Sequence, residues 1–522
     1  MERGAARSWL LAVAALLSAA ATTAAFPPWD QGWLAWLALV PLVVVCRRLA
    51  PGTAFGVGLL AGFLAANGIF LWMFQVSGYR WHHALLLGTY LGLYPAIWCA
   101  ALPVLARSRA PWVVTAPALW VILDAIRAHA GFLALPWATL GQSQHRDLAI
   151  LQWAALGGEL AITGLVVLAN VALGALLTER AWRATAAAAA VIVLAHAGGG
   201  LVLAVPATSR PVVLAAVQPS IGIVERVEAT GRATIIRRLE RLTVAAAQAR
   251  PALIAWPETA VADLRNDPFL AQRVQALARS TRIPLLVGSS EVVKFAPAES
   301  APAAPPAREV YNTAYLVLPD SPLGEPYRKM RLVPFAEYLP LVPFVTWPRW
   351  LVSPGFAVTP GYQPRVFTLP SGVRAGTLIC WESLFADLAR GAVEGGADLL
   401  VLLTNDAWFG RTGAAAQHNL SAVMRAVENR TPVVIASNTG PSAIVDSDGR
   451  VVGGALAPFS EGVVIAAVSV RRAREAYTWI SGALVPVALV AVALGLFWRS
   501  GKEEVRVGQR GERDSGSEAR HR

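Results

Sequence analysis

The chain has 522 residues, of which 55% are hydrophobic and 15% charged, and its formal net charge is +12. A soluble globular protein carries about 25% charged residues, so this composition excludes an ordinary cytosolic enzyme, a disordered protein and a coiled coil. The basic residues are scattered and form no stripe interleaved with aromatic residues, which argues against nucleic acid as a partner. Three cysteines are too few for a disulfide framework.

About eight apolar stretches have roughly the length needed to cross a bilayer. Seven of them precede residue 206, the second and fifth are the shortest, and the first has a signal peptide as its alternative interpretation. The predicted spans are Ser8–Phe26, Trp33–Cys46, Thr53–Val76, Ala84–Ala106, Trp112–Ala125, Ile150–Leu177, Ala184–Val205 and Trp479–Trp498. The sequence therefore predicts an α-helical transmembrane bundle with a large insertion before its last helix.

The positions of the arginines predict the orientation of this bundle. Arg47 and Arg48 follow the second span and Arg107 follows the fourth, whereas the loop Pro27–Gly32 after the first span has no basic residue. Cytoplasmic loops carry an excess of Lys and Arg, so we expect both termini in the cytoplasm and the insertion outside it. Ionisable residues are sparse within the spans, which favours an anchor over an ion pathway.

The insertion itself alternates short β-rich runs with helical patterns, which predicts an α/β domain. We divide the chain into a seven-span region (1–206), this domain (207–476), a carboxyl-terminal transmembrane helix (477–499) and a disordered basic tail (500–522). Within the domain, residues 295–308 are rich in Pro and Ala and are predicted to be a flexible surface insertion.

A cysteine lies at one predicted strand end. Cys380 follows the apolar run Ala375–Ile379, and Trp381-Glu382-Ser383 opens a predicted helix. A thiol on such a turn is exposed near a helix N-terminus, which favours a nucleophilic thiolate. The position alone is equally compatible with a buried core cysteine.

Two charged residues add to this candidate site. Glu258 follows the apolar run Leu253–Pro257, where a carboxylate can be partly desolvated and act as a general base; a solvated loop acid or helix cap is the alternative. Lys329 is one of three lysines among 45 basic residues. A lysine in a chain that otherwise uses arginine indicates a need for a compact ammonium, as at an oxyanion site, unless it is a chance surface lysine.

Together Glu258, Lys329 and Cys380, in this chain order, resemble the catalytic residues of the nitrilase superfamily. The motifs that carry the resemblance are Trp256-Pro257-Glu258-Thr259, Tyr327-Arg328-Lys329 with Pro334–Tyr338, and Ile379-Cys380-Trp381-Glu382. With its membrane flanks the chain resembles the apolipoprotein N-acyltransferases, and further matches are Leu140–Gln144, Tyr311–Thr313, Gly361–Arg365 and Thr404–Gly410. It departs from the family pattern at Pro219-Ser220, Arg331 and Ala336.

This resemblance implies a nitrilase-like α-β-β-α sandwich in a bacterial inner membrane protein, with the sandwich on the periplasmic side. It implies that a fatty acyl chain moves from a phospholipid, phosphatidylethanolamine, to the N-terminal amine of an S-diacylglyceryl-cysteine in apolipoproteins. Glu258 would be the base, Lys329 the oxyanion donor and Cys380 the nucleophile that forms a thioester. No cofactor is implied, and the seven histidines show no metal-ligand spacing.

Four residues are second candidates on the same resemblance. Glu337 would position Lys329, Glu382 would position the Cys380 turn, and Asn312 and Trp381 would line the pocket; both acids could also be surface residues. The aromatic-rich segment from Phe335 to Trp350 is interpreted as a lid that dips into the bilayer, or as ordinary core.

Two other functions fit parts of the sequence. The same three residues would serve a membrane-anchored amidase or nitrilase-type hydrolase, in which water accepts the acyl group. A transporter or lipid-binding membrane protein with an inactive nitrilase-like domain is the alternative from a different class.

Overall fold

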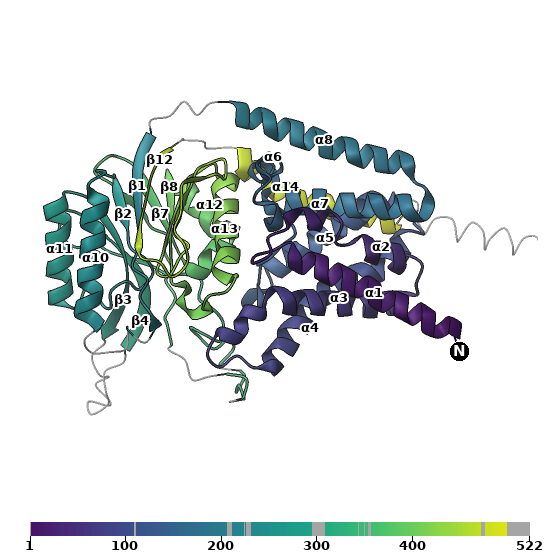
Figure 1. Ribbon diagram of the computed structural model, residues 1–522, viewed down its shortest axis with the longest axis horizontal. Helices are drawn as coiled ribbons and strands as arrows, with labels where there is room; N and C mark the ends of the chain where they lie inside the picture. The colour runs from purple at the N-terminus through teal and green to yellow at the C-terminus, as the bar shows by residue number, and fades with distance from the viewer. Residues whose placement is uncertain are drawn as a thin grey trace, which may run out of the picture.

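The computed structural model describes residues 2–108, 111–205, 211–223, 225, 231–294, 308–342, 344–348, 350–352, 357–470 and 476–497. The predicted tail at 500–522 and all but the last residue of the predicted insertion at 295–308 lie outside these ranges. A bundle of helices and a two-sheet domain lie end to end (Figure 1).

The bundle is formed by the first helices of the chain together with the last one. Short 3-10 helices η1 (Gly32–Trp36), η2 (Leu71–Gln75), η3 (Gly131–Leu133) and η4 (Gln142–Gln144) lie in its connections. The helices are α1 (Glu2–Ala24), α2 (Val40–Cys46), α3 (Pro51–Ile69), α4 (Trp81–Leu105), α5 (Trp112–Ala128), α6 (Leu148–Leu151), α7 (Ala154–Glu179), α8 (Trp182–Ala204) and α14 (Ala476–Phe497).

Four helices of the described chain are long and apolar enough to cross a membrane: α3, α4, α7 and α8. The prediction of about eight spans is not confirmed. The second predicted span is not one helix, because η1 ends at Trp36 and a new helix, α2, starts with Pro41 near its first position. At 1.5 Å per residue the seven residues of α2 rise only about 10 Å, too little to cross a bilayer alone.

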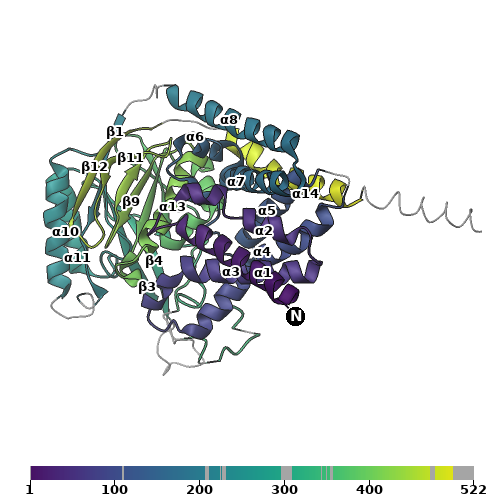
Figure 2. The ribbon, with the colours of Figure 1, turned by 45° about the vertical axis from the view of Figure 1, so that its right-hand side comes forward.

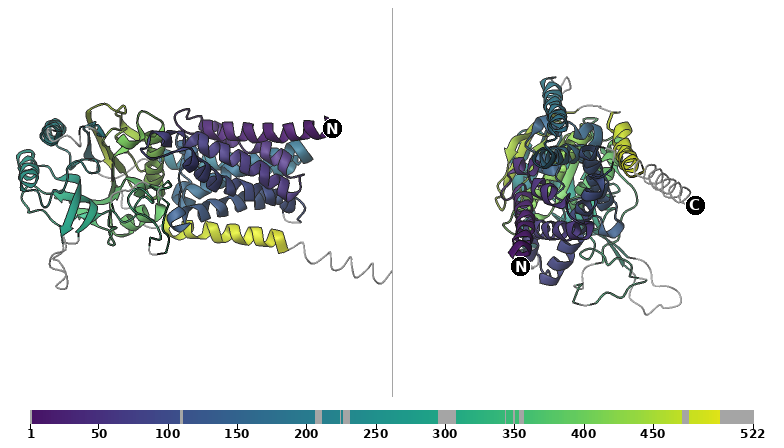
Figure 3. Two further views of the ribbon diagram at one scale, coloured as in Figure 1. Left: turned by 90° about the horizontal axis from the view of Figure 1, so that it is seen from below. Right: turned by 90° about the vertical axis from the view of Figure 1, so that its right-hand side faces the viewer.

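The sandwich caps one end of the bundle. Figure 3 shows the first turn of α1 and the end of α14 at the opposite end of the bundle from the sheets. The two described ends of the chain therefore lie on one side and the sandwich on the other.

The domain contains two six-stranded sheets packed face to face. One sheet has the order β12-β1-β2-β3-β4-β5 and the other β11-β10-β9-β8-β7-β6. The strands are β1 (Pro211–Gln218), β2 (Leu253–Ala255), β3 (Leu285–Lys294), β4 (Arg308–Val317), β5 (Tyr327–Arg328), β6 (Val366–Thr368), β7 (Arg374–Ile379), β8 (Leu399–Thr404), β9 (Val433–Ser437), β10 (Ala443–Val445), β11 (Val451–Ala455) and β12 (Gly462–Ser469).

Helices cover the outer face of each sheet, so the layers are α-β-β-α as predicted. Helices α10 (Gly231–Ala247) and α11 (Pro268–Thr281) cover the first sheet, and α12 (Ala386–Glu394) and α13 (Ala414–Glu428) cover the second (Figure 1); Figure 2 shows α10, α11 and α13 from a second side. Strands β7, β8 and β9 are parallel, as are β1, β2 and β3. Because the carboxyl ends of parallel strands meet at one edge of a sheet, the loops that follow them share one end of the sandwich.

Helix α13 lies between the second sheet and the bundle, and a buried ionic network joins it to α7. Arg425 pairs with Glu159 of α7 at 3.0 Å and with Glu428 at 2.9 Å. The backbone N–H of Glu159 also donates to Glu428, at 3.1 Å. Helix α7 is kinked there because Gly158 has φ +66° and ψ −172°, a conformation open essentially to glycine alone. The kink brings a bundle carboxylate into contact with the domain.

Candidate active site

Glu258 lies in the turn after β2, at the end of the sandwich where the parallel strands finish. It is 7% exposed, and Asn312 of β4 donates to its Oε1 at 2.7 Å. The neighbouring strand approaches closely, since a Cβ on Gly288 of β3 would lie 2.1 Å from the carbonyl oxygen of Pro257. Glycine at 288 therefore lets the Glu258 turn pack against the sheet.

Lys329 directly follows β5, and its backbone N–H extends the β4–β5 ladder by donating to Asn312 O at 2.8 Å. The side chain is 1% exposed. Its Nζ lies 2.8 Å from Glu337 Oε1 and 3.6 Å from Glu258 Oε1. Burial lowers the pKa of Lys329, but the two carboxylates outweigh it and raise the pKa overall. The buried side chain is therefore an ammonium held between two acids.

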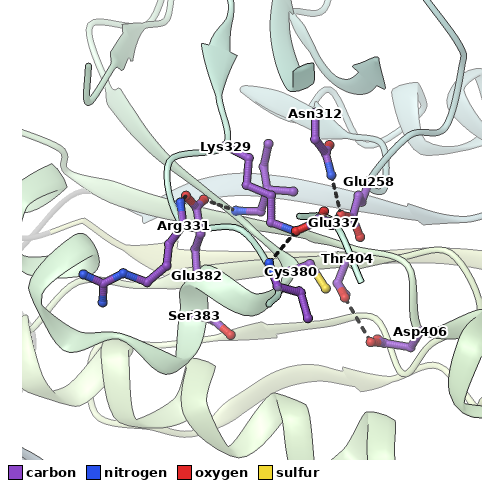
Figure 4. A network of polar contacts seen from close by, with 12 residues as sticks. Glu258, Asn312, Lys329, Arg331, Glu337, Cys380, Glu382, Ser383, Thr404 and Asp406 are labelled. Carbon is purple, nitrogen blue, oxygen red and sulfur yellow. Dashed lines mark hydrogen bonds and ion pairs between the residues drawn. The ribbon is translucent and has the colours of Figure 1, made fainter. Parts of the chain in front are cut away.

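Cys380 begins a 3-10 helix, η5 (Cys380–Leu384), which we call the elbow, immediately after β7. Its φ of +50° is unusual for a residue with a side chain. Figure 4 shows its side chain beside Glu258, Lys329 and Glu337. Burial raises the pKa of the Cys380 thiol well above its ordinary value, the Glu258 carboxylate adds to the rise, and the Lys329 ammonium opposes it. The resting thiol is therefore protonated and needs a base.

Glu382, within the elbow, is 0% exposed and accepts four hydrogen bonds. Met330 N and Arg331 N donate to Oε1 at 2.7 and 3.0 Å, and Tyr327 Oη and Ile379 N donate to Oε2, each at 2.8 Å. Burial raises the pKa of Glu382, which these donors partly offset. One carboxylate thus ties the strand before Cys380 to both sides of Lys329.

The other second candidates lie around the same cluster. Glu337 accepts from Lys329 and, through Oε2, from Val333 N at 2.7 Å, so it closes the loop after the lysine. Asn312 is buried, and its Oδ1 has no hydrogen-bond partner among the described residues. Trp381 packs against Phe385 and against Trp137 of the bundle, with ring centroids 5.9 and 6.3 Å apart.

A cavity of about 510 Å³ opens between bundle and sandwich beside these residues. Its lining comes from both halves and includes Phe132, Met330, Arg331, Tyr338, Trp381 and Phe385.

The predicted lid lies beside the cavity. Phe344 is 86% exposed and Trp350 61% exposed, which contradicts ordinary core packing for these two aromatics. Others in the segment are partly buried, since Phe335 packs on Trp347 with ring centroids 5.0 Å apart.

The structure also adds polar residues that the sequence-based site did not include. Asp406 follows β8, the strand beside β7, and accepts from Thr404 Oγ1 at 3.0 Å (Figure 4). His418 of α13 lies against the same carboxylate at 3.1 Å. Asp406 could have been found, because it ends the neighbouring parallel strand, but His418 comes from a helix whose rotation the sequence does not define. Among the described residues no cluster of three or more His, Cys, Asp or Glu is arranged to hold a metal.

Comparisons with known proteins give the family. The Carbon-nitrogen hydrolase family model matches residues 213–478, and the model of the Apolipoprotein N-acyltransferase N-terminal domain matches residues 18–172. A Geobacter metallireducens protein named apolipoprotein N-acyltransferase is 32% identical, over 92% of this chain and 95% of its own. The chain belongs to the apolipoprotein N-acyltransferase family.

Two other proteins named apolipoprotein N-acyltransferase match this chain to a similar degree. The Allorhizobium ampelinum protein is 29% identical, over 96% of this chain and 100% of its own. The Gloeobacter violaceus protein is 31% identical, over 82% of this chain and 82% of its own. The solved structure of Saccharomyces cerevisiae Nit3, a member of branch 10 of the nitrilase superfamily, covers 51% of this chain and 93% of its own at 19% identity, with a TM-score of 0.38. The sequence matches, together with the two-sheet domain, bear out the resemblance to apolipoprotein N-acyltransferases.

Proposed function

We propose that this protein moves a fatty acyl chain from phosphatidylethanolamine to the N-terminal amine of an S-diacylglyceryl-cysteine in apolipoproteins. The observation that carries the proposal is the buried Lys329 ammonium, held between Glu258 and Glu337 beside Cys380. An adjacent cavity lined by both bundle and sandwich suits a substrate that arrives from the bilayer.

In the first half-reaction Glu258 takes the thiol proton, and the Cys380 sulfur attacks the ester carbonyl of the phospholipid. Lys329 and the backbone N–H of Trp381 stabilise the tetrahedral oxyanion. The ester C–O bond then breaks, Glu258 returns its proton to the leaving alkoxide, and lysophospholipid departs. An acyl thioester remains on Cys380.

In the second half-reaction the neutral α-amine of the acceptor attacks the thioester. Glu258 accepts a proton from the nitrogen, the C–S bond breaks, and the Cys380 thiolate is reprotonated from Glu258. The free Oδ1 of Asn312 offers the attacking amine a hydrogen-bond acceptor next to that base. Glu337 and Glu382 hold Lys329 and the elbow in place, and Trp381 lines the cavity.

The proposed setting is a bacterial inner membrane, with the sandwich on the periplasmic side and both termini in the cytoplasm. The arginine pattern of the loops supports this, as do the described chain ends on the far side of the bundle. The proposed division is 1–206, 207–476, 477–499 and 500–522. The exposed Phe344 and Trp350 would then enter the outer leaflet beside the cavity.

The deciding experiment places the purified full chain in nanodiscs that contain phosphatidylethanolamine labelled in its acyl chain. Mass analysis should find a labelled thioester on the Cys380 peptide, and the label should move to an added diacylglyceryl-cysteine peptide. Cys380→Ser is the control, because an oxygen in place of sulfur cannot form the thioester.

Each alternative function gives a different result. Steady release of free fatty acid, or turnover of small soluble amides without lipid, would mean a hydrolase. Absence of any adduct, with full function of Cys380→Ser in cells, would mean an inactive domain and overturn the proposal.

A further inference from the structure

His418 is a buried histidine that the proposed reaction does not use. It is 1% exposed and projects from α13 toward the elbow. Its Nε2 lies 3.2 Å from the backbone carbonyl oxygen of Cys380 and 3.2 Å from Ser383 Oγ. Its Nδ1 lies 3.1 Å from Asp406 Oδ1. Both ring nitrogens therefore face oxygen atoms.

The hydrogen atoms around Nε2 can be assigned by counting donors and acceptors. The Ser421 hydroxyl lies 2.7 Å from the carbonyl oxygen of His418, which only accepts, so its hydrogen is committed there. The Ser383 hydroxyl lies 2.8 Å from Ser421 Oγ and donates its single hydrogen to that oxygen. Ser383 Oγ and the Cys380 carbonyl are then both acceptors toward Nε2. This nitrogen must carry a hydrogen.

The other ring nitrogen, Nδ1, faces a polar cluster that follows β8. Asp406 Oδ1 lies 3.1 Å from Nδ1 and also accepts from Thr404 Oγ1, while Ser437 Oγ, 2.9 Å away, donates to Asp406 Oδ2. Thr404 Oγ1 itself lies 3.5 Å from Nδ1. These contacts hold the ring so that Nε2 is directed at the elbow.

We propose that His418 is the positioning residue for the nucleophile, holding the Cys380 carbonyl through Nε2–H. Trp137, from the loop between α5 and η4, stacks on the imidazole ring at 5.4 Å and 19°. The bundle therefore helps to fix the plane of the ring that faces the elbow.

The consequence concerns the left-handed backbone of Cys380. A residue with a side chain at φ +50° is held there only by surrounding contacts. The hydrogen bond from Nε2–H to the Cys380 carbonyl is such a contact, and it sets the direction of the thiol toward Glu258 and Lys329.

The test combines NMR with turnover, using the full chain in nanodiscs. In protein labelled with ¹⁵N-histidine, the ring signals that His418→Gln removes should include that of an Nε2 that carries a hydrogen. His196→Gln is the matched control and should leave this signal unchanged, because His196 also pairs with an aspartate, Asp147 at 2.9 Å, but on a partly exposed helix.

Turnover gives the second readout, and it rests on the proposed acyl transfer, whereas the NMR signal does not. His418→Gln keeps an N–H donor for the Cys380 carbonyl but on a side chain without a rigid ring, so kcat should fall about tenfold with KM nearly unchanged. His418→Leu removes the donor and should lower kcat about a hundredfold. A wild-type His418 ring with no hydrogen on Nε2, or a His418→Leu kcat within about twofold of wild type, would overturn the proposal.

Discussion

Glu382→Gln is nearly isosteric, yet the structure predicts a large effect. All four partners of the carboxylate are donors, so an amide NH₂ at either oxygen position meets donors. At the Oε1 position the NH₂ group leaves two backbone N–H groups without an acceptor. At the Oε2 position it leaves only Ile379 N without one, because the Tyr327 hydroxyl can turn to accept from the amide. Each buried donor without an acceptor costs about 1–3 kcal/mol. The remaining bonds also lose their charge assistance, so we expect a total of about 2–4 kcal/mol.

This cost should be visible in both stability and rate. The thermal midpoint of the protein in nanodiscs should fall, and acyl-enzyme formation should slow by at least about tenfold, because small misplacements of reacting groups are costly. Glu240→Gln is the control, since Glu240 pairs with Arg273 on the outer helices α10 and α11. A Glu382→Gln protein with wild-type midpoint and acylation rate would refute the idea that this carboxylate fixes the elbow to the lysine loop.

Three further predictions concern titration and backbone shape. Because burial raises the pKa of Cys380, alkylation by iodoacetamide should accelerate steadily from neutral to alkaline pH; a plateau at neutral pH would contradict this. Burial raises the pKa of Glu428 from 4.5 to about 7, so between these pH values the native state holds a proton that the unfolded state has lost. The free energy of unfolding should therefore decline as pH rises between them. In thermal unfolding, Glu428→Gln should flatten this decline. In the same unfolding assay, Gly158→Ala should destabilise the protein by about 1–3 kcal/mol, because alanine does not adopt the backbone conformation of Gly158. Gly164→Ala on the same helix is the control and should not destabilise it, because the added Cβ meets only Val121, at 3.5 Å.

The short apolar runs of the domain predicted an α/β fold, and the resemblance to the nitrilase superfamily implied its layers. The runs Leu253–Pro257 and Ala375–Ile379, which precede Glu258 and Cys380, match β2 and β7 to within two residues. Strand β12 was missed, although its eight residues pair antiparallel with the whole of β1. That pairing joins residues about 250 positions apart, which no local pattern encodes.

The charged residues of the candidate site could be found because each one ends an apolar run or is chemically unusual for this chain. Their mutual distances could not, since they depend on how β4 and β5 pair and on the turn after β2. Membrane crossing was the weakest prediction. Composition finds apolar stretches, but whether Trp33–Cys46 continues as one helix depends on local backbone geometry that hydropathy does not contain.

The outer covering of the second sheet has a consequence for how the molecule is assembled. Apolar side chains of α6 and α7, among them Ile150, Leu151 and Ile162, belong to the same buried cluster as Val423 and Val427 of α13. The outer side of this sheet is therefore fully covered only when these bundle helices are in place. A chain in which α6 and α7 have not docked would expose the apolar side chains of α13, so the folding of the bundle and that of the sandwich are coupled.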